Sequence, residues 1–149
     1  MLGLMQDWPL TVDKVLDHAR AINGSREIVT RRVEGDIRRT TYAQLWQDAK
    51  RVSAALKDSQ VSLGDRVATM GWNSERHMAA WFGTMGIGAV LHTLNPRLHP
   101  DQIAWIINHA EGKILIFDKT LLPIVETIKD KIPTVKQFII IAGRDTMPD

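Results

Sequence analysis

Residues 88–118 read GAVLHTLNPRLHPDQIAWIINHAEGKILIFD, a pattern typical of a strand, a helix and a second strand. The first strand pattern ends at Asn95, Pro96 and Arg97, three residues that resist regular structure. The last strand, residues 113–117 (KILIF), is apolar without alternation, and such strands are usually covered on both faces, as in a parallel sheet. The stretch therefore predicts a βαβ crossover between buried strands. It places Asn95, Pro96 and Arg97 at a strand tip, where open α/β sheets bind their ligands.

The same alternation of strands and helices continues on both sides of this stretch. Further strand patterns occupy residues 66–70 (RVATM) and 137–141 (QFIII), and the second of these is again apolar without alternation. We expect KILIF and QFIII to be inner parallel strands. Apolar residues at helical spacing separate the strands, over residues 42–57, 74–85 and 121–131.

The N-terminal part has a different pattern. Residues 11–23 have the apolar spacing of a helix, and residues 28–33 and 37–41 are β-prone runs joined by Glu-Gly-Asp, which predicts a hairpin near the periphery. Thr41, with Gln44 three residues later, forms a capping box for the next helix. The predicted fold class is α/β, a layered βα subdomain with a mainly parallel sheet and a peripheral N-terminal hairpin, in one domain over residues 1–149.

The composition is that of a globular protein. Of the 149 residues, 44% are hydrophobic and 24% are charged, which argues against disorder, and the length is enough to bury a real core. There is no cysteine, which excludes disulfides and thiol chemistry, and the net charge of +2 is too balanced for a nucleic-acid binder. No secretory leader or membrane span is predicted, so we expect a cytoplasmic chain.

No self-contained catalytic or metal site is predicted. Gly83, Gly86 and Gly88 follow a helix in the order G-x-x-G-x-G, the reverse of dinucleotide-binding spacing, and we interpret them as the end of that helix. The five histidines form no helical zinc motif, and His92, inside a strand, is predicted to be a hydrogen-bonded core residue. His109, in the last turn of a helix, is explained by the helix dipole.

Four arginines fall on the predicted hairpin: Arg31, Arg32, Arg38 and Arg39. They have no interleaved aromatic residues of the kind that stack on single-stranded RNA. A solvated face therefore explains them better than an RNA-binding site.

Three runs together resemble one family. They are TTYAQL at 40–45, GDRVATMGWNSERHMAAWFGTMGIGAVLHTLNPRL at 64–98, and IAWIINHAEGKILIFD at 103–118. This combination resembles the N-terminal part of the adenylate-forming acyl-CoA ligases, and especially the bacterial medium- and long-chain fatty-acid CoA ligases. The resemblance covers nearly the whole chain, from about Trp8 to Ile141.

The resemblance implies a reaction in two steps. The parent enzyme would activate a fatty acid with ATP and Mg²⁺ to an acyl-adenylate, and would then form a thioester with coenzyme A (CoA). The family's Ser/Thr/Gly-rich loop ending in Pro-Lys-Gly, its aromatic-Thr-Glu motif, its ribose-binding Asp and its catalytic Lys do not occur in the 149 residues. We therefore interpret the chain as a fragment of the large N-terminal domain, inactive alone, with no cofactor bound and no catalytic residue of its own. The alternative is a free-standing flavodoxin-like binding or interaction module derived from a ligase.

The resemblance also implies one binding site and one kind of association. Asn95 and Arg97 match the loop that lies near the CoA channel in these enzymes, so they are the predicted substrate-binding residues. Basic residues that some relatives use for the CoA nucleotide would fall just after Asp118, where only Lys119 is basic. We further expect self-association or a homodimer, because a subdomain of a larger sheet leaves an edge and an apolar face uncovered.

Overall fold

The computed structural model describes residues 3–4, 7–143 and 146–147. The elements in chain order are α1 (Val12–Asn23), β1 (Glu27–Arg31), β2 (Ile37–Thr41), α2 (Tyr42–Asp58), β3 (Arg66–Met70), α3 (Glu75–Met85), β4 (Val90–Thr93), α4 (Pro100–His109), β5 (Ile114–Asp118), η1 (Lys119–Leu121), α5 (Leu122–Ile128), η2 (Lys129–Lys131) and β6 (Gln137–Ile141). None of the helices in these described ranges is long and apolar enough to cross a membrane.

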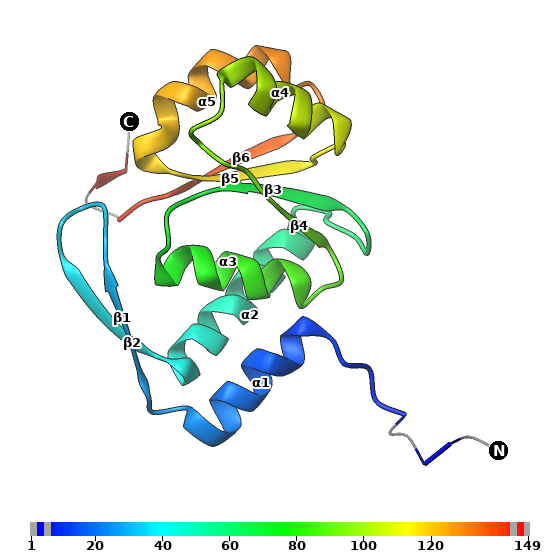
Figure 1. Cartoon of the computed structure of the whole chain (residues 1–149), viewed down its shortest axis with the longest axis vertical. Coiled ribbons are helices and arrows are strands. Elements are labelled where there is room, and N and C mark those ends of the chain that lie inside the picture. Colours follow the sequence, from blue (N-terminus) through cyan, green and yellow to red (C-terminus); the bar gives the residue numbers. More distant parts are fainter. Residues whose placement is uncertain (1–2, 5–6, 144–145, 148–149) are drawn as a thin grey trace.

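Four strands form one parallel sheet in the order β4-β3-β5-β6, and β1 and β2 form a separate antiparallel hairpin. Helices cover both faces of the sheet: α4 and α5 lie on one face, α2 and α3 on the other, and α1 packs against α2 and α3 further out (Figure 1). The predicted α/β class, the parallel sheet and the peripheral hairpin are confirmed.

The two inner strands carry the core. All five residues of β5 are buried, as are four of the five residues of β3. Alternate side chains point to opposite faces, so Leu115 and Phe117 pack under α4 and α5, while Ile114 and Ile116 pack toward α2 and α3. The unbroken apolar run KILIF is therefore explained by helices on both faces.

The two outer strands differ from the prediction. QFIII was expected to be an inner strand, but β6 lies at the edge of the sheet among the described residues, and Phe138 is 41% exposed. The strand pattern of residues 89–94 predicts burial, whereas β4 is the opposite edge and its Val90 is 48% exposed. The apolar character of β6 reflects partial cover on its two faces, which pattern alone does not distinguish from an inner position.

Gly83 has a packing role beyond helix punctuation. A Cβ at this position would lie 2.7 Å from Val52 Cβ and 2.8 Å from the carbonyl oxygen of Ala49, both on α2. Ser53 Oγ also donates a hydrogen bond to the Gly83 carbonyl at 2.7 Å. Glycine thus lets α3 approach α2 closely. Gly86 ends α3 as predicted.

The hairpin is attached by charged side chains at its tip. Arg32 Nε donates to Glu75 Oε1 at 2.8 Å, and Arg76 NH1 donates to Glu34 Oε1 at 2.7 Å, so two ion pairs join the hairpin to the start of α3. Arg32 is therefore a half-buried structural residue, contrary to the solvated face predicted for the four arginines. Arg39, in an exposed pair with Glu27, fits that prediction. The capping box of Thr41 and Gln44 is confirmed.

Helix α1 leaves much of its apolar side uncovered. Leu16 is its one buried residue among the described side chains, whereas Val12, Val15 and Ile22 are 48%, 60% and 68% exposed. These three residues lie on one stripe of the helix, since they are spaced by three and seven positions.

Candidate functional site

The sheet has a topological switch point between β3 and β5. These neighbouring strands are parallel, but β3 leads into α3 on one face and β5 leads through η1 into α5 on the other (Figure 1). The chain therefore leaves the carboxyl ends of β3 and β5 toward opposite faces of the sheet. In open α/β sheets this divergence creates the crevice in which ligands bind.

Trp72 lies at this switch point and is held by three hydrogen bonds. Its indole Nε1 donates to Thr120 Oγ1 at 2.8 Å, and its backbone N–H donates to Asp118 Oδ2 at 3.5 Å. Its carbonyl accepts from His77 Nδ1 at 3.2 Å. The side chain is nevertheless 37% exposed, so an ordered aromatic ring faces solvent where the two strands diverge.

His77 supports this arrangement from the first turn of α3. Burial is the main cause that lowers its pKa, which favours the neutral imidazole at pH 7. Because a carbonyl only accepts, the hydrogen on Nδ1 must point at Trp72, and Nε2 then accepts from the hydroxyl of Thr69 at 3.0 Å. His77 is thus a half-buried link between β3 and the Trp72 loop.

Asp118 is the buried carboxylate of the switch point. It is 2% exposed, and its Oδ1 has no hydrogen-bond partner among the described residues. Burial raises the pKa of Asp118, nearby Glu34 raises it further, and the hydrogen bond from Trp72 opposes the shift. Asp118 was not predicted as a site residue, because its position at the end of an apolar run does not show that its carboxylate becomes enclosed.

The two predicted binding residues lie at the tip of β4, beside this crevice. Asn95 Oδ1 accepts from the backbone N–H of Arg97 at 3.0 Å, and the Asn95 carbonyl accepts from Leu98 N–H at 3.3 Å. The Asn95 side chain therefore closes a turn, which is a structural role. Arg97 is exposed, and its guanidinium makes no hydrogen bond to the residues that the structure describes.

His92 does not fill the role predicted for it. It is only partly buried, and its Nδ1, although enclosed, has no hydrogen-bond partner in the described part of the chain. Burial lowers the pKa of His92, which favours the neutral imidazole. His109 stacks on Trp105 with ring centroids 4.7 Å apart.

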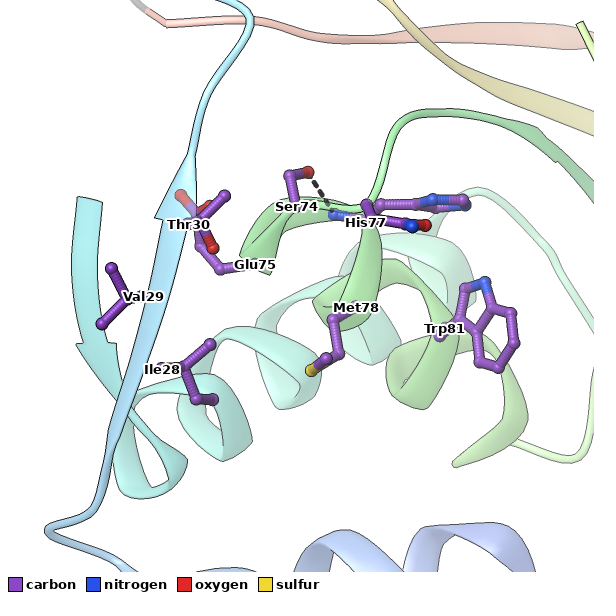
Figure 2. Close-up of a pocket in the computed structure, with 9 residues that line it drawn as sticks. Ile28, Val29, Thr30, Ser74, Glu75, His77, Met78 and Trp81 are labelled. Atoms are coloured by element: carbon purple, nitrogen blue, oxygen red, sulfur yellow. Dashed lines mark hydrogen bonds between the residues drawn. The ribbon is translucent and has the colours of Figure 1, made fainter. Parts of the chain in front are cut away.

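A second hollow, of about 310 Å³, lies between the hairpin and α3. Ile28 of β1 points toward Met78 of α3 across it, and Glu75 lies at its polar end near Thr30 (Figure 2). Val29 and Trp81 also line it. Sequence reasoning did not find this hollow, because nothing in the pattern tells which helix the hairpin stands against.

The family assignment follows from comparison of the sequence with known proteins. The profile of the family described as AMP-binding enzyme matches residues 16–148. The chain belongs to the AMP-binding enzyme family. The resemblance predicted from three sequence runs is therefore confirmed.

The relatives in this AMP-binding family include several CoA ligases. The chain is 48% identical over 136 residues to a long-chain-fatty-acid–CoA ligase of Thermus thermophilus, covering 91% of this chain and 25% of the relative. It is 41% identical over 145 residues to a 3-methylmercaptopropionyl-CoA ligase of Ruegeria pomeroyi, covering 97% and 27%. It is 37% identical over 146 residues to a medium-chain-fatty-acid–CoA ligase of Ectopseudomonas oleovorans, covering 98% and 27%. The chain thus spans about a quarter of the length of these curated relatives.

Solved structures of AMP-binding enzymes share the fold. A Mycobacterium tuberculosis fatty acyl CoA synthetase superposes with a TM-score of 0.78 at 25% identity, covering 88% of this chain and 26% of that one. The anthranilate CoA ligase AuaEII, solved with anthranoyl-AMP, superposes with a TM-score of 0.78 at 23% identity, covering 92% and 27%. The similarity to AuaEII shows only that the two proteins share a fold.

The described residues contain no cluster of metal-ligating side chains. No group of three or more His, Asp or Glu side chains there is arranged to hold a metal ion. The candidate site is the carboxyl edge of the sheet, formed by the loops after β4, β3 and β5, because the topological switch point lies there.

Proposed function

We propose that residues 1–149 contribute one α/β unit to the large N-terminal domain of a longer fatty-acid CoA ligase. That enzyme activates a fatty acid with ATP to an acyl-adenylate and pyrophosphate, and then transfers the acyl group to the thiol of CoA. The observation that carries the proposal is the 48% identity, over 91% of this chain, to a long-chain-fatty-acid–CoA ligase. The 37% identity to a medium-chain ligase supports the same substrate class.

Under the proposal, the phosphates of ATP and the Mg²⁺ ion are bound by parts of the ligase other than this chain. The sequence has no Ser/Thr/Gly-rich phosphate loop, and no cluster of carboxylates or histidines in the described residues suits a metal. This unit therefore supplies no catalytic residue. Its contribution is to shape one wall of the site at the carboxyl edge of the sheet.

CoA is the substrate that the residues of this edge fit best. Arg97 presents a permanent charge and forked donors, which suit a phosphate oxygen, from a turn that Pro96 and Asn95 make rigid. In the proposed roles Arg97 binds a phosphate of CoA, and Asn95 holds the loop in position through its hydrogen bond to the Arg97 backbone. CoA itself supplies the thiol that accepts the acyl group.

The proposal is tested on the ligase that contains this chain. With ATP, Mg²⁺ and a fatty acid it should release pyrophosphate, and on addition of CoA it should form the thioester. The 149-residue chain is the control and should release no pyrophosphate above background. A longer protein that forms neither product from fatty acids of eight to eighteen carbons would refute the proposed activity.

The role of Arg97 is tested separately within the same enzyme. Arg97→Ala should raise KM for CoA while leaving the rate of acyl-adenylate formation unchanged, because the side chain is proposed to contact only CoA. Arg51→Ala is the matched control, since Arg51 is an exposed arginine on α2 that pairs with Asp48. An unchanged KM for CoA would leave Arg97 as an ordinary surface residue.

We also propose that the chain associates with a second copy through the exposed stripe of Val12, Val15 and Ile22 on α1. Contact between two copies would remove these apolar side chains from water, as contiguous exposed apolar surface at an interaction site does. The proposed location of the enzyme is the cytoplasm, where its proposed substrates ATP and CoA are found.

A further inference from the structure

We propose that Trp72 is the surface on which the purine base of a bound nucleotide stacks. The inference rests on the proposed function for the identity of that nucleotide, which is the adenosine end of CoA or of ATP. Trp72 belongs to no binding motif identified in the sequence, and the pairing of β3 with β5 places it at the switch point.

The first argument is that the Trp72 ring is ordered and exposed at once. The backbone N–H, the carbonyl and the indole Nε1 of Trp72 each make a hydrogen bond, to Asp118, His77 and Thr120 respectively. The indole bond of 2.8 Å fixes the ring plane, while the side chain remains 37% exposed. A ring held in place before binding loses little conformational freedom on stacking. It therefore binds a planar partner more tightly than a mobile ring would.

The second argument comes from the other tryptophans, whose rings already have partners. Arg20 and Lys50 lie over the Trp46 ring, Lys14 lies over Trp8, and Trp105 stacks on His109. Trp81 meets the edge of His77 at 6.4 Å between centroids and lines the hollow under the hairpin. Within the described residues no cation or second ring lies over the face of Trp72.

The surroundings of Trp72 suit a nucleotide. It lies at the topological switch point, and exposed Arg97 after β4 and half-buried Lys119 after β5 bring positive charge to the same edge of the sheet. The pocket that Trp72 lines together with Asn73, Asp118 and Ile141 measures only about 20 Å³. A base is too large to enter that pocket, so in our proposal it stacks on the exposed part of the Trp72 ring, with its phosphates toward the basic side chains.

The experiment uses the 149-residue chain and three phosphate probes. Adenosine 3′,5′-bisphosphate represents the nucleotide end of CoA, AMP represents the ATP source, and ribose 5-phosphate lacks a base. Binding is followed by the ¹H–¹⁵N signal of the Trp72 indole, assigned through its loss in Trp72→Phe. We expect the two adenine nucleotides, but not ribose 5-phosphate, to shift this signal. A larger shift with the bisphosphate than with AMP would point to CoA. Equal shifts would show that the site recognises the base and does not distinguish the phosphates.

Variants decide whether the ring itself is the contact. Trp72→Ala should weaken binding of adenosine 3′,5′-bisphosphate by about tenfold or more, as loss of one base–aromatic stack does. Trp72→Phe should retain part of the affinity, and Thr120→Val, which removes the acceptor of the indole hydrogen bond, should lose part of it. Trp105→Ala, on an exposed tryptophan of α4, is the matched control and should bind as the wild type does.

Three results would overturn the inference: no shift with either nucleotide at 10 mM, equal binding of ribose 5-phosphate, or an unchanged Kd in Trp72→Ala with an unchanged far-UV circular dichroism spectrum. If Trp72→Ala fails to fold, Thr120→Val and Trp72→Phe carry the test. Failure of the proposed function is distinguishable, because it would abolish thioester formation by the longer enzyme. It would leave Trp72-dependent adenine binding by this chain intact.

Discussion

Truncation of Ile116 to alanine tests the central claim of the fold, that β5 is an inner strand covered on both faces. Ile116 is 4% exposed and packs toward α2 and α3 together with Val67 and Ala80. Its strand neighbours on the two sides are Thr69 of β3 and Ile139 of β6. Because these strands and helices enclose Ile116, they can move little to fill the cavity that its truncation would leave.

The expected loss follows from the groups removed. Ile116→Ala deletes three buried carbon groups, worth about 0.8 kcal/mol each in transfer free energy, so the minimum loss is about 2.4 kcal/mol. The cavity adds to this in proportion to the volume that remains open, which takes such substitutions to about 5 kcal/mol. We therefore expect the free energy of unfolding to fall by about 2–5 kcal/mol.

The measurement is urea unfolding followed by far-UV circular dichroism, with the m-value checked for two-state behaviour. Ile37→Ala on β2 is the matched control, because it removes the same groups from a side chain that is 62% exposed and lies outside the stripe on α1. Its effect should stay within about 0.5 kcal/mol. A loss below about 1 kcal/mol for Ile116→Ala, at an unchanged m-value, would show that β5 is not a core strand and would refute the topology.

Two further predictions concern Asp118 and α1. Since the folded-state pKa of Asp118 is raised above its ordinary value of 3.8, the folded chain binds more protons than the unfolded chain from that pH up to the raised value. The contribution of Asp118 to the free energy of unfolding therefore falls as pH rises through that window. Asp118→Asn, which keeps an acceptor for Trp72 N–H, should gain stability relative to the wild type over the same window in urea unfolding, and a pH-independent difference would contradict the cause. Val15→Glu should shift sedimentation toward the monomer, whereas Val90→Glu on the β4 edge should not. A wild-type chain that stays monomeric at high concentration would count against the α1 interface.

Local chemistry was enough to predict much of the fold. The capping box at Thr41 and Gln44, the hairpin and the parallel sheet all follow from residues close together in sequence, because turn geometry, capping and apolar periodicity are local properties. The family was predictable for a related reason, since the run from residue 64 to residue 98 combines several such local signals. The turn formed by Asn95 was also predictable, because an Asn side chain reaches the backbone two residues later.

The sequence by itself determined which segments are strands and helices, and which loop stands at the tip of β4. Only the tertiary structure decided which strands are inner. KILIF and QFIII have the same pattern, yet β5 has neighbours on both sides and β6 on one, because strand order depends on how distant crossovers pack. The same holds for the site. Trp72, His77, Asp118 and Thr120 come from segments up to 48 positions apart, and no local pattern specifies that an indole N–H will meet a particular threonine. Their meeting is a consequence of β3 lying beside β5, which the packing of α3 and α5 on opposite faces allows.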